Sequence, residues 1–192
     1  MLNLLAKSGI RRKIILLFVY NQESEFYLSE IARQVKTSAG TAQRELNRLR
    51  AMDFVSFKKR GNLSLYRLNR NFSLLREIEA IIRMTFGIEV MLREELRGVK
   101  GISFALIFGS YAAGGMKSGS DIDLCLVGRP DEDAVYRAVQ AVEDTVGREI
   151  NYHIASEDEF ARKARMGSFM RNAMAKPLML LGSEDDLRKL AH

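Results

Sequence analysis

Residues 102–128 read ISFALIFGSYAAGGMKSGSDIDLCLVG. The first seven are mostly apolar and predict a strand that runs directly into Gly109 and Ser110, where a helical turn is expected. Ten residues separate Ser110 from Asp121, which stands near the start of a second predicted strand. Because side chains alternate along a strand, Asp121 and Asp123 share one face and the apolar residues beside them point to the other. The stretch therefore predicts two strands that present a pair of carboxylates next to a glycine-serine turn.

Two carboxylates this close favour a bound cation, because like charges repel each other without one. Asp121 and Asp123 are expected about 6–7 Å apart along the strand, so they can share Mg²⁺ or Mn²⁺. The missing side chain of Gly109 lets backbone amides approach a phosphate, and the Ser110 hydroxyl at a helix start can hold phosphate oxygens. Together with Ser120, these residues are the candidate binding site for a nucleoside triphosphate. Such a site favours phosphoryl chemistry through metal charge and positioning.

The order of these features, GSx10DxD, resembles the nucleotidyltransferase superfamily that includes DNA polymerase beta, the CCA-adding enzymes, aminoglycoside nucleotidyltransferases and minimal nucleotidyltransferases. Residues 103–182 have the length of a minimal member. The resemblance implies a Mg²⁺-dependent domain that binds a nucleoside triphosphate. The alternative is a capping serine and a surface aspartate pair on an edge strand.

The superfamily usually has a third carboxylate on a following strand, expected here within residues 149–154. Alignment with the superfamily pattern places this position at Asn151, which departs from it. Glu149 lies two residues earlier on the same face, where it either substitutes for the missing acid or is a solvated strand residue. An asparagine can bind a metal through its carbonyl oxygen but cannot accept a proton. The catalytic candidates are thus Asp121 and Asp123, which the resemblance implies, and Glu149, which its position on the strand suggests; the candidate metal ligands are Asp121, Asp123 and Asn151.

The positive charge of the chain is concentrated in its first third. Residues 1–72 contain fourteen Lys and Arg against five Asp and Glu, whereas residues 73–192 contain sixteen against nineteen. An apolar run at 14–20 predicts a first helix, Ser29 is a plausible N-cap for a short second helix, and Ser38 for a third. Strand-like segments at 55–57 and 63–66 are joined by a basic loop in which Gly61 and Asn62 can take positive φ, which predicts a β-hairpin.

Three helices followed by a hairpin with a basic tip resemble the winged helix-turn-helix regulators over roughly residues 10–70. The resemblance implies that the third helix enters the major groove of double-stranded DNA and that the hairpin touches its backbone or minor groove. The residues carried over as facing bases are Ser38, Thr41, Gln43 and Arg44, and those near phosphates are Arg48, Lys58, Lys59 and Arg60. The alternative is a module that binds another protein.

The expected fold class is α+β. A winged helix at 1–72 is followed by a connecting helix at 73–98 and a nucleotidyltransferase-like α/β domain with a small mixed sheet at 99–192. The connecting segment is either one amphipathic helix or a pair broken near Gly87. It would pack the two domains together or form the seam of a homodimer.

Composition excludes several classes of protein. No apolar run approaches the roughly 18 residues of a membrane span, so no membrane association is expected. The single cysteine, Cys125, cannot form an internal disulfide, and two histidines do not make a structural zinc cluster, which fits a reducing cytoplasm.

Three functions are compatible with these patterns. The first is a DNA-binding regulator whose second domain binds a nucleoside triphosphate and transfers a nucleotidyl group to an unknown acceptor. The second is an antitoxin-type enzyme that modifies a partner protein recruited by the winged helix. The third is a catalytically degenerate, nucleotide-sensing DNA-binding protein.

Overall fold

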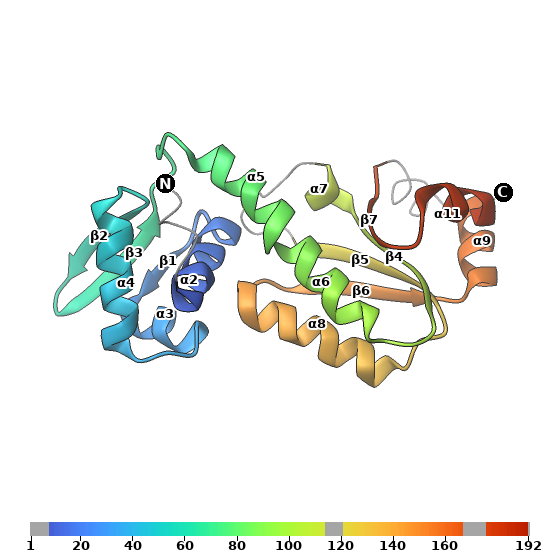
Figure 1. The fold of residues 1–192 in the computed structure, drawn as a ribbon, viewed down its shortest axis with the longest axis horizontal. Coiled ribbons are helices and arrows are strands. Elements are labelled where there is room, and N and C mark those ends of the chain that lie inside the picture. The colour runs from blue at the N-terminus through green and yellow to red at the C-terminus, as the bar shows by residue number, and fades with distance from the viewer. Residues whose placement is uncertain (1–7, 114–120, 167–175, 192) are drawn as a thin grey trace. The chain divides into compact units, whose positions relative to one another are not determined.

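The computed structural model describes residues 8–113, 121–166 and 176–191 (Figure 1). Its contacts divide the chain into two compact units, formed mainly by residues 1–82 and by residues 83–192, each of which is described by itself. Within the described residues, no helix combines the length and the apolar character that a membrane span requires.

The first unit combines helices with a three-stranded antiparallel sheet in the order β1-β3-β2. Seven consecutive side chains of its first helix, residues 14–20, are buried, as the apolar run predicts. Ser38 caps the third helix by accepting from the Thr41 amide at 3.2 Å, also as predicted. The elements in chain order are α2 (Gly9–Tyr20), β1 (Glu25–Tyr27), α3 (Leu28–Gln34), α4 (Ala39–Ala51), β2 (Val55–Arg60), β3 (Leu63–Leu68) and α5 (Leu75–Thr85), whose last three residues, 83–85, belong to the second unit.

Two details of this unit correct the sequence predictions. The short helix α3 begins at Leu28 rather than after Ser29, because the Glu30 carboxylate accepts from the Tyr27 amide at 2.7 Å and closes the first turn there. The hairpin strands are also longer than expected. Strand β2 pairs with β3 as far as Arg60, so the basic residues lie in a strand and not in a loop.

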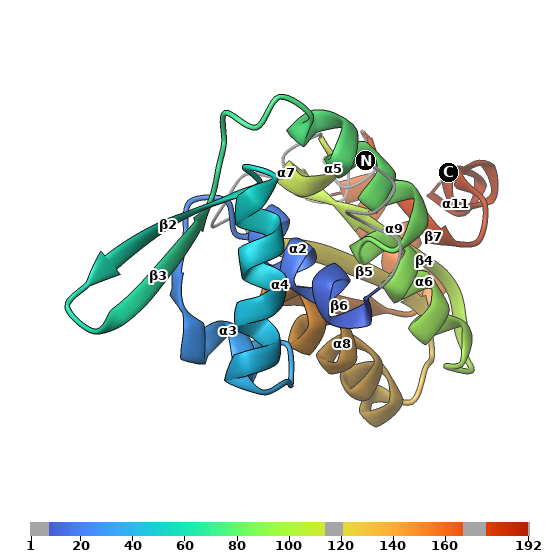
Figure 2. The same ribbon diagram turned by 60° about the vertical axis from the view of Figure 1, so that its left-hand side comes forward.

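The hairpin turn is correspondingly tight. Only Gly61 and Asn62 separate the paired residues Arg60 and Leu63. Gly61 has a φ of 61° whereas Asn62 does not have a positive φ, so the turn has the φ pattern of the II′ type. Figure 2 shows the resulting ribbon of β2 and β3 extending beyond α4.

A buried ion pair joins two helices of the first unit. Arg11 on α2 donates from Nε to Oε2 of Glu45 on α4 at 2.7 Å, and both side chains are about nine-tenths buried. The other oxygen of the same carboxylate accepts from Arg48 at 2.7 Å. Removing one partner of such a pair lowers the stability of the fold by more than the pair itself contributes, because the remaining charge is then buried without a partner.

The second unit is built around a four-stranded mixed sheet in the order β6-β5-β4-β7. Strands β5 and β6 are parallel, and β4 is antiparallel to both β5 and β7, so the predicted small mixed sheet is present. The connecting segment forms a pair of helices interrupted at Gly87, the second of its two alternatives. The elements are α6 (Ile88–Arg97), β4 (Ile102–Phe108), α7 (Gly109–Ala112), β5 (Ile122–Gly128), α8 (Glu132–Val146), β6 (Ile150–Ala155), α9 (Glu157–Met166), β7 (Leu178–Leu181) and α11 (Glu184–Ala191).

Alternation along β5 divides the sheet into two faces. Ile122, Leu124 and Leu126 are fully buried on one face. On the other, Cys125 and Val127 join a core cluster with Phe160 of α9 and Leu187 of α11. Asp123 belongs to this second face, at the edge where the apolar cluster ends. The fold thus buries most of β5 and leaves Asp123, near the start of the strand, only partly buried.

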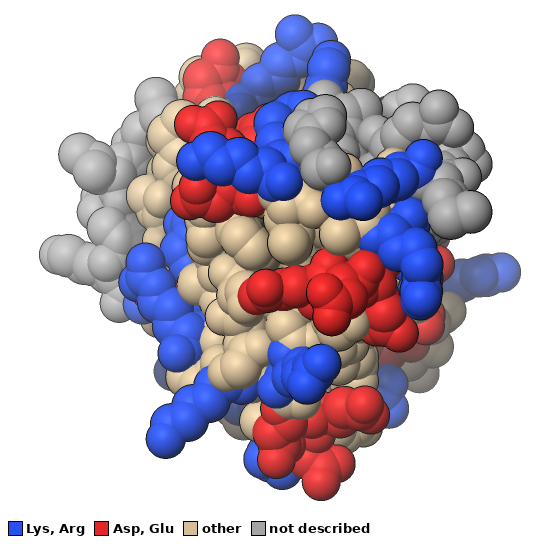
Figure 3. All heavy atoms as spheres, turned by 90° about the vertical axis from the view of Figure 1, so that its right-hand side faces the viewer, with Lys and Arg blue, Asp and Glu red and all other residues tan. Residues whose placement is uncertain are grey.

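The surface at the α9 and α11 end has no single sign of charge. Figure 3 shows lysine and arginine side chains interspersed with acidic ones on this face. Helix α9 itself begins with three acidic residues and ends with Lys163 and Arg165. This distribution is typical of a solvated helical surface rather than of a basic field for nucleic acid.

Candidate functional site

The candidate site lies where β4 ends and β5 begins. The two strands are antiparallel, and their register pairs Phe108 with Asp123, so the residue after Phe108 lies next to that carboxylate. Gly109 has a φ of 74°, and a Cβ atom placed on it would come within 2.5 Å of Asp123 Oδ2. A glycine is therefore required here for two reasons, its left-handed backbone and the close approach of the carboxylate.

Strand β6 adds Asn151 to the site. The parallel register pairs Asn151 with Asp123, so both side chains project from the same face of the sheet. The amide Nδ2 of Asn151 donates to Asp121 Oδ2 at 3.0 Å. Asp121 lies just before the strand and is exposed, so this hydrogen bond ties its carboxylate to the sheet. The structure thus brings Asp121, Asp123 and Asn151 together.

The electrostatics of this group favour a cation. Burial, followed by the neighbouring Asp121, raises the pKa of Asp123 above its ordinary value, and His153 opposes the shift. His153 lies two residues after Asn151 on β6 and therefore on the same face. A carboxylate with a raised pKa next to a second carboxylate is stabilised when a cation binds between them.

The donor set fits a hard divalent cation. Carboxylate and amide oxygens are the ligands that Mg²⁺ and Mn²⁺ prefer. Within residues 8–113, 121–166 and 176–191, however, no three Asp, Glu, His or Cys side chains come close enough to hold a metal together. The two aspartates thus provide the charge, and Asn151 is the neutral neighbour.

Glu149 does not join this group. It is exposed and precedes β6, and its backbone carbonyl accepts from the Ile122 amide at 3.3 Å. The three-carboxylate arrangement expected from Asp121, Asp123 and Glu149 is therefore not formed among the described side chains. The physical reason is position, because Glu149 stands before the strand begins and level with Asp121 rather than Asp123.

Of the remaining candidates for nucleotide binding, Ser110 is exposed in the single turn of α7 and is free of the core. Ser120 lies outside the described residues. Sequence reasoning missed Tyr111, which is fully buried beside Ser110 and donates from its hydroxyl to Glu89 Oε1 at 2.9 Å. An aromatic residue inside an otherwise small-residue turn was the available signal.

The residues expected to face bases lie on the third helix of the first unit. Thr41 accepts from the Arg44 guanidinium at 3.1 Å, and Arg44 is exposed. Gln43 instead points to the sheet, where its Nε2 donates to Tyr66 Oη at 2.7 Å as well as to Asn47 Oδ1 at 3.0 Å. The structure thus shows Arg44 available at the surface and the Gln43 amide already engaged. Ser38 is exposed and caps the helix.

The residues expected near phosphates are on two elements of the first unit. Arg48 pairs with Glu45 while most of its side chain stays exposed. Lys58, Lys59 and Arg60 are exposed at the distal end of β2.

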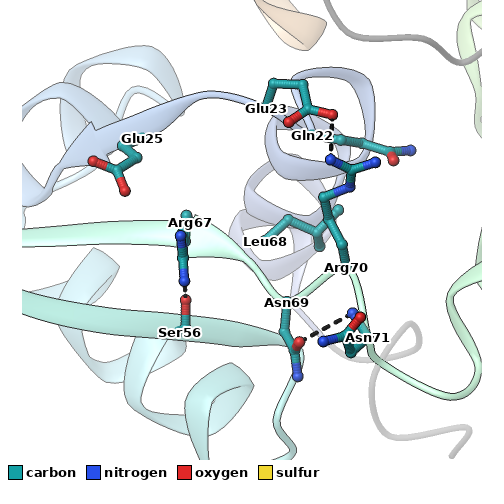
Figure 4. A pocket seen from close by; sticks show the side chains of 9 residues that line it. All are labelled: Gln22, Glu23, Glu25, Ser56, Arg67, Leu68, Asn69, Arg70 and Asn71. Atoms are coloured by element: carbon teal, nitrogen blue, oxygen red, sulfur yellow. Dashed lines mark hydrogen bonds and ion pairs between the residues drawn. The ribbon is translucent and has the colours of Figure 1, made fainter.

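A polar hollow of about 350 Å³ also lies on the first unit (Figure 4). Its polar groups largely bond to each other. Arg67 donates to Ser56 Oγ at 3.1 Å, and Arg70 pairs with Glu23 at 2.5 Å. The residues that line it are Gln22, Glu23, Glu25, Ser56, Arg67, Leu68, Asn69, Arg70 and Asn71. None of them is a candidate site residue, so this hollow is separate from the phosphoryl-transfer candidates.

Comparison with known families found a similarity that lies mainly within the second unit. Residues 91–165 match the family described as polymerase beta, nucleotidyltransferase. The matched segment contains Gly109, Asp121, Asp123 and Asn151. This part of the chain is therefore similar to that family. No curated protein matches the chain.

Several solved structures show partial similarity. NolR from Sinorhizobium fredii is 21% identical, with a TM-score of 0.38 over 45% of this chain and 81% of that one. A toxin-antitoxin structure with AMP-PNP is 19% identical, with a TM-score of 0.38 over 54% and 81% of the two chains. The DNA-binding protein Sso10a-2 from Sulfolobus solfataricus is 19% identical, with a TM-score of 0.33 over 41% and 81%. Similarity at this level assigns no function.

Proposed function

We propose that the second unit is a divalent-cation-dependent nucleotidyltransferase that binds a nucleoside triphosphate and transfers a nucleoside monophosphate to an acceptor. The observation that carries the proposal is the packing of the Asp123 carboxylate against Gly109 within the family-matched segment. This arrangement places a glycine backbone suited to phosphate directly beside a carboxylate suited to a metal.

Each residue of the site has a role in this proposal. Asp121 and Asp123 hold Mg²⁺ or Mn²⁺, and Asn151 keeps Asp121 in place through its 3.0 Å hydrogen bond. Gly109 leaves room for the phosphates, and the exposed Ser110 hydroxyl donates to one of their oxygens. A cation held by Asp121 and Asp123 would supply positive charge near the α-phosphoryl group and the departing pyrophosphate.

The reaction exchanges one phosphorus–oxygen bond for another. An acceptor oxygen bonds to the α-phosphorus while the bond to pyrophosphate breaks, and the proton of the acceptor is released. Asn151 cannot take that proton. We propose Glu149 as the candidate base, acting through solvent, since it is the nearest carboxylate in sequence to the β6 position where the superfamily has its third acid.

A transfer assay with labelled ATP, GTP, CTP and UTP tests this function. Wild type is compared with Asp121→Asn and Asp123→Asn, and Asp158→Asn is the control because it changes an exposed acid on another element. Protein, nucleic-acid and small-molecule acceptors are separate arms. We expect Mg²⁺-dependent transfer that both site variants lose and the control keeps. Nucleotide binding without transfer would indicate a sensor, and absence of both would refute the proposal.

Glu149→Gln separates the assignment of the base from the assignment of the metal site. If Glu149 takes the acceptor proton, this variant loses transfer and still binds nucleotide with Mg²⁺. Unchanged transfer would show that Glu149 is only a solvated residue.

For the first unit we propose a winged helix that binds double-stranded DNA. The specific support is that Arg44, Lys58, Lys59 and Arg60 are exposed and form no ion pair among the described residues. Exposed cations without acidic partners are available to phosphates and bases. Since Gln43 is engaged by Tyr66, Arg44 is the stronger candidate for contact with a base.

DNA binding measured across salt concentrations tests this second proposal. Arg44→Ala is compared with wild type, and Arg97→Ala is the charge-matched control on α6. We expect a sequence-specific complex that Arg44→Ala loses and Arg97→Ala retains. Equally weak binding of all sequences, with only a salt dependence, would exclude base readout, and no binding would favour a protein-interaction module.

A further inference from the structure

Tyr111 links the turn formed by Gly109 and Ser110 to helix α6. Tyr111 follows Ser110 directly in the four-residue helix α7, and its side chain is completely buried. Its hydroxyl donates to Oε1 of Glu89, the second residue of α6, at 2.9 Å. A buried tyrosine hydroxyl needs a hydrogen-bond partner, and Glu89 provides it.

The position of α7 depends on this kind of contact. A helix of one turn is not stable by itself, because too few hydrogen bonds offset the cost of ordering its residues. The placement of Gly109 against Asp123 must therefore be fixed by tertiary contacts. Besides Glu89, these include Arg83 of α5, whose guanidinium lies 5.4 Å from the centroid of the Tyr111 ring.

The chain retains an unfavourable group to make this contact. Glu89 Oε2 is buried and has no hydrogen-bond partner among the described residues. A buried carboxylate oxygen without a partner opposes folding. A residue that is unfavourable for folding and contacts a functional turn is typical of a residue kept for the site.

We infer that Glu89 is a positioning residue, which acts through Tyr111 to hold the Gly109–Ser110 turn in place for the nucleotide phosphates. The inference rests on the proposed nucleotidyltransferase function. Glu89 and Arg83 precede residue 91, where the family match begins, so that match does not contain them.

Nucleotide affinity tests the inference. Tyr111→Phe, Glu89→Leu and Glu89→Gln are titrated with Mg²⁺ and whichever of ATP, GTP, CTP and UTP wild type binds best. We expect Kd to rise about tenfold, which is about 1.4 kcal/mol, in Tyr111→Phe and Glu89→Leu. Glu89→Gln should bind as wild type does, because its side-chain oxygen still accepts from Tyr111. The inference would be overturned if Glu89→Leu and Glu89→Gln raised Kd equally. It would also be overturned if either Glu89→Leu or Tyr111→Phe left Kd unchanged.

Two control variants test whether the effect is specific to these positions. Hydrogen exchange is a second readout, which requires no nucleotide. Tyr136→Phe and Glu94→Leu change exposed residues of the same types and should bind normally. The Ala113 amide donates to the Gly109 carbonyl at 3.2 Å, so its hydrogen exchange reports the order of the turn. We expect faster exchange in Tyr111→Phe and Glu89→Leu only. If wild type binds no nucleotide, the proposed function fails, while unchanged exchange in those two variants would separately overturn the inference.

Discussion

Replacing Gly109 with alanine is expected to disrupt the site far more than the fold. The new Cβ would lie 2.5 Å from Asp123 Oδ2 and 3.5 Å from Asp123 Cγ, so the carboxylate oxygen must retreat by about 1 Å to reach ordinary contact. The φ of 74° adds about 1–2 kcal/mol for an alanine in the left-handed region. A displacement of about 1 Å at a reacting group lowers activity by about 100-fold. We therefore expect modest destabilisation and nearly complete loss of Mg²⁺-dependent nucleotide binding and transfer.

Gly61→Ala is the matched control. Gly61 has a φ of 61°, but a Cβ placed on it meets nothing within 4 Å. This variant therefore carries the backbone penalty without the contact with Asp123. Denaturant unfolding should show similar losses of stability in both variants, and calorimetry with Mg²⁺ and nucleotide should show impaired binding in Gly109→Ala alone. Wild-type affinity in Gly109→Ala would refute the assignment of this turn to the phosphates.

Three further changes test other parts of the structure. Glu45→Ala should lower the free energy of unfolding by about 3–5 kcal/mol, measured by denaturant titration, because it removes the buried carboxylate that Arg11 binds; a loss below about 1 kcal/mol, as at an exposed pair, would contradict this burial. Burial raises the pKa of the Cys125 thiol from 9.0 to about 11. Between these pH values the folded protein keeps a proton that the unfolded chain releases, so the free energy of unfolding should fall by about 2 kcal/mol as pH rises from 9 to 11. Cys125→Ala should remove that pH dependence, and its persistence would assign it to another group. Asn151→Asp should lower the melting temperature of the metal-free protein, because it removes the hydrogen-bond donor to Asp121 and adds a like charge. Added Mg²⁺ should restore the melting temperature, and a melting temperature insensitive to Mg²⁺ would place the metal elsewhere.

The sequence predicted much of the candidate site because local patterns determine it. The spacing of Asp121 and Asp123 is sufficient to predict that they lie close together, although Asp121 precedes the first residue of β5 in the structure, and the apolar strand before Gly109 brings the turn beside Asp123. The hydrogen bond between Asn151 and Asp121 was not predictable in the same way. It depends on the parallel register of β5 and β6, which is set across a helical crossover.

The features that were missed depend on contacts distant in sequence or on very short elements. Tyr111 and Glu89 are separated by more than twenty positions, and neither residue alone indicates the other. Strand β1 has only three residues, too few to show an alternating pattern, and it forms because β3 offers it an edge. The hairpin was predicted too short because charged residues at the end of β2 look like a loop, whereas pairing with β3 continues through them.

The most direct test of the proposed nucleotidyltransferase site is a crystal structure of the protein with Mg²⁺ and a non-hydrolysable nucleoside triphosphate analogue. We expect a cation about 2.0–2.1 Å from an oxygen of Asp121 and of Asp123, with the triphosphate over Gly109 and Ser110. A nucleotide bound away from Gly109, or a cation that contacts neither aspartate, would contradict the site.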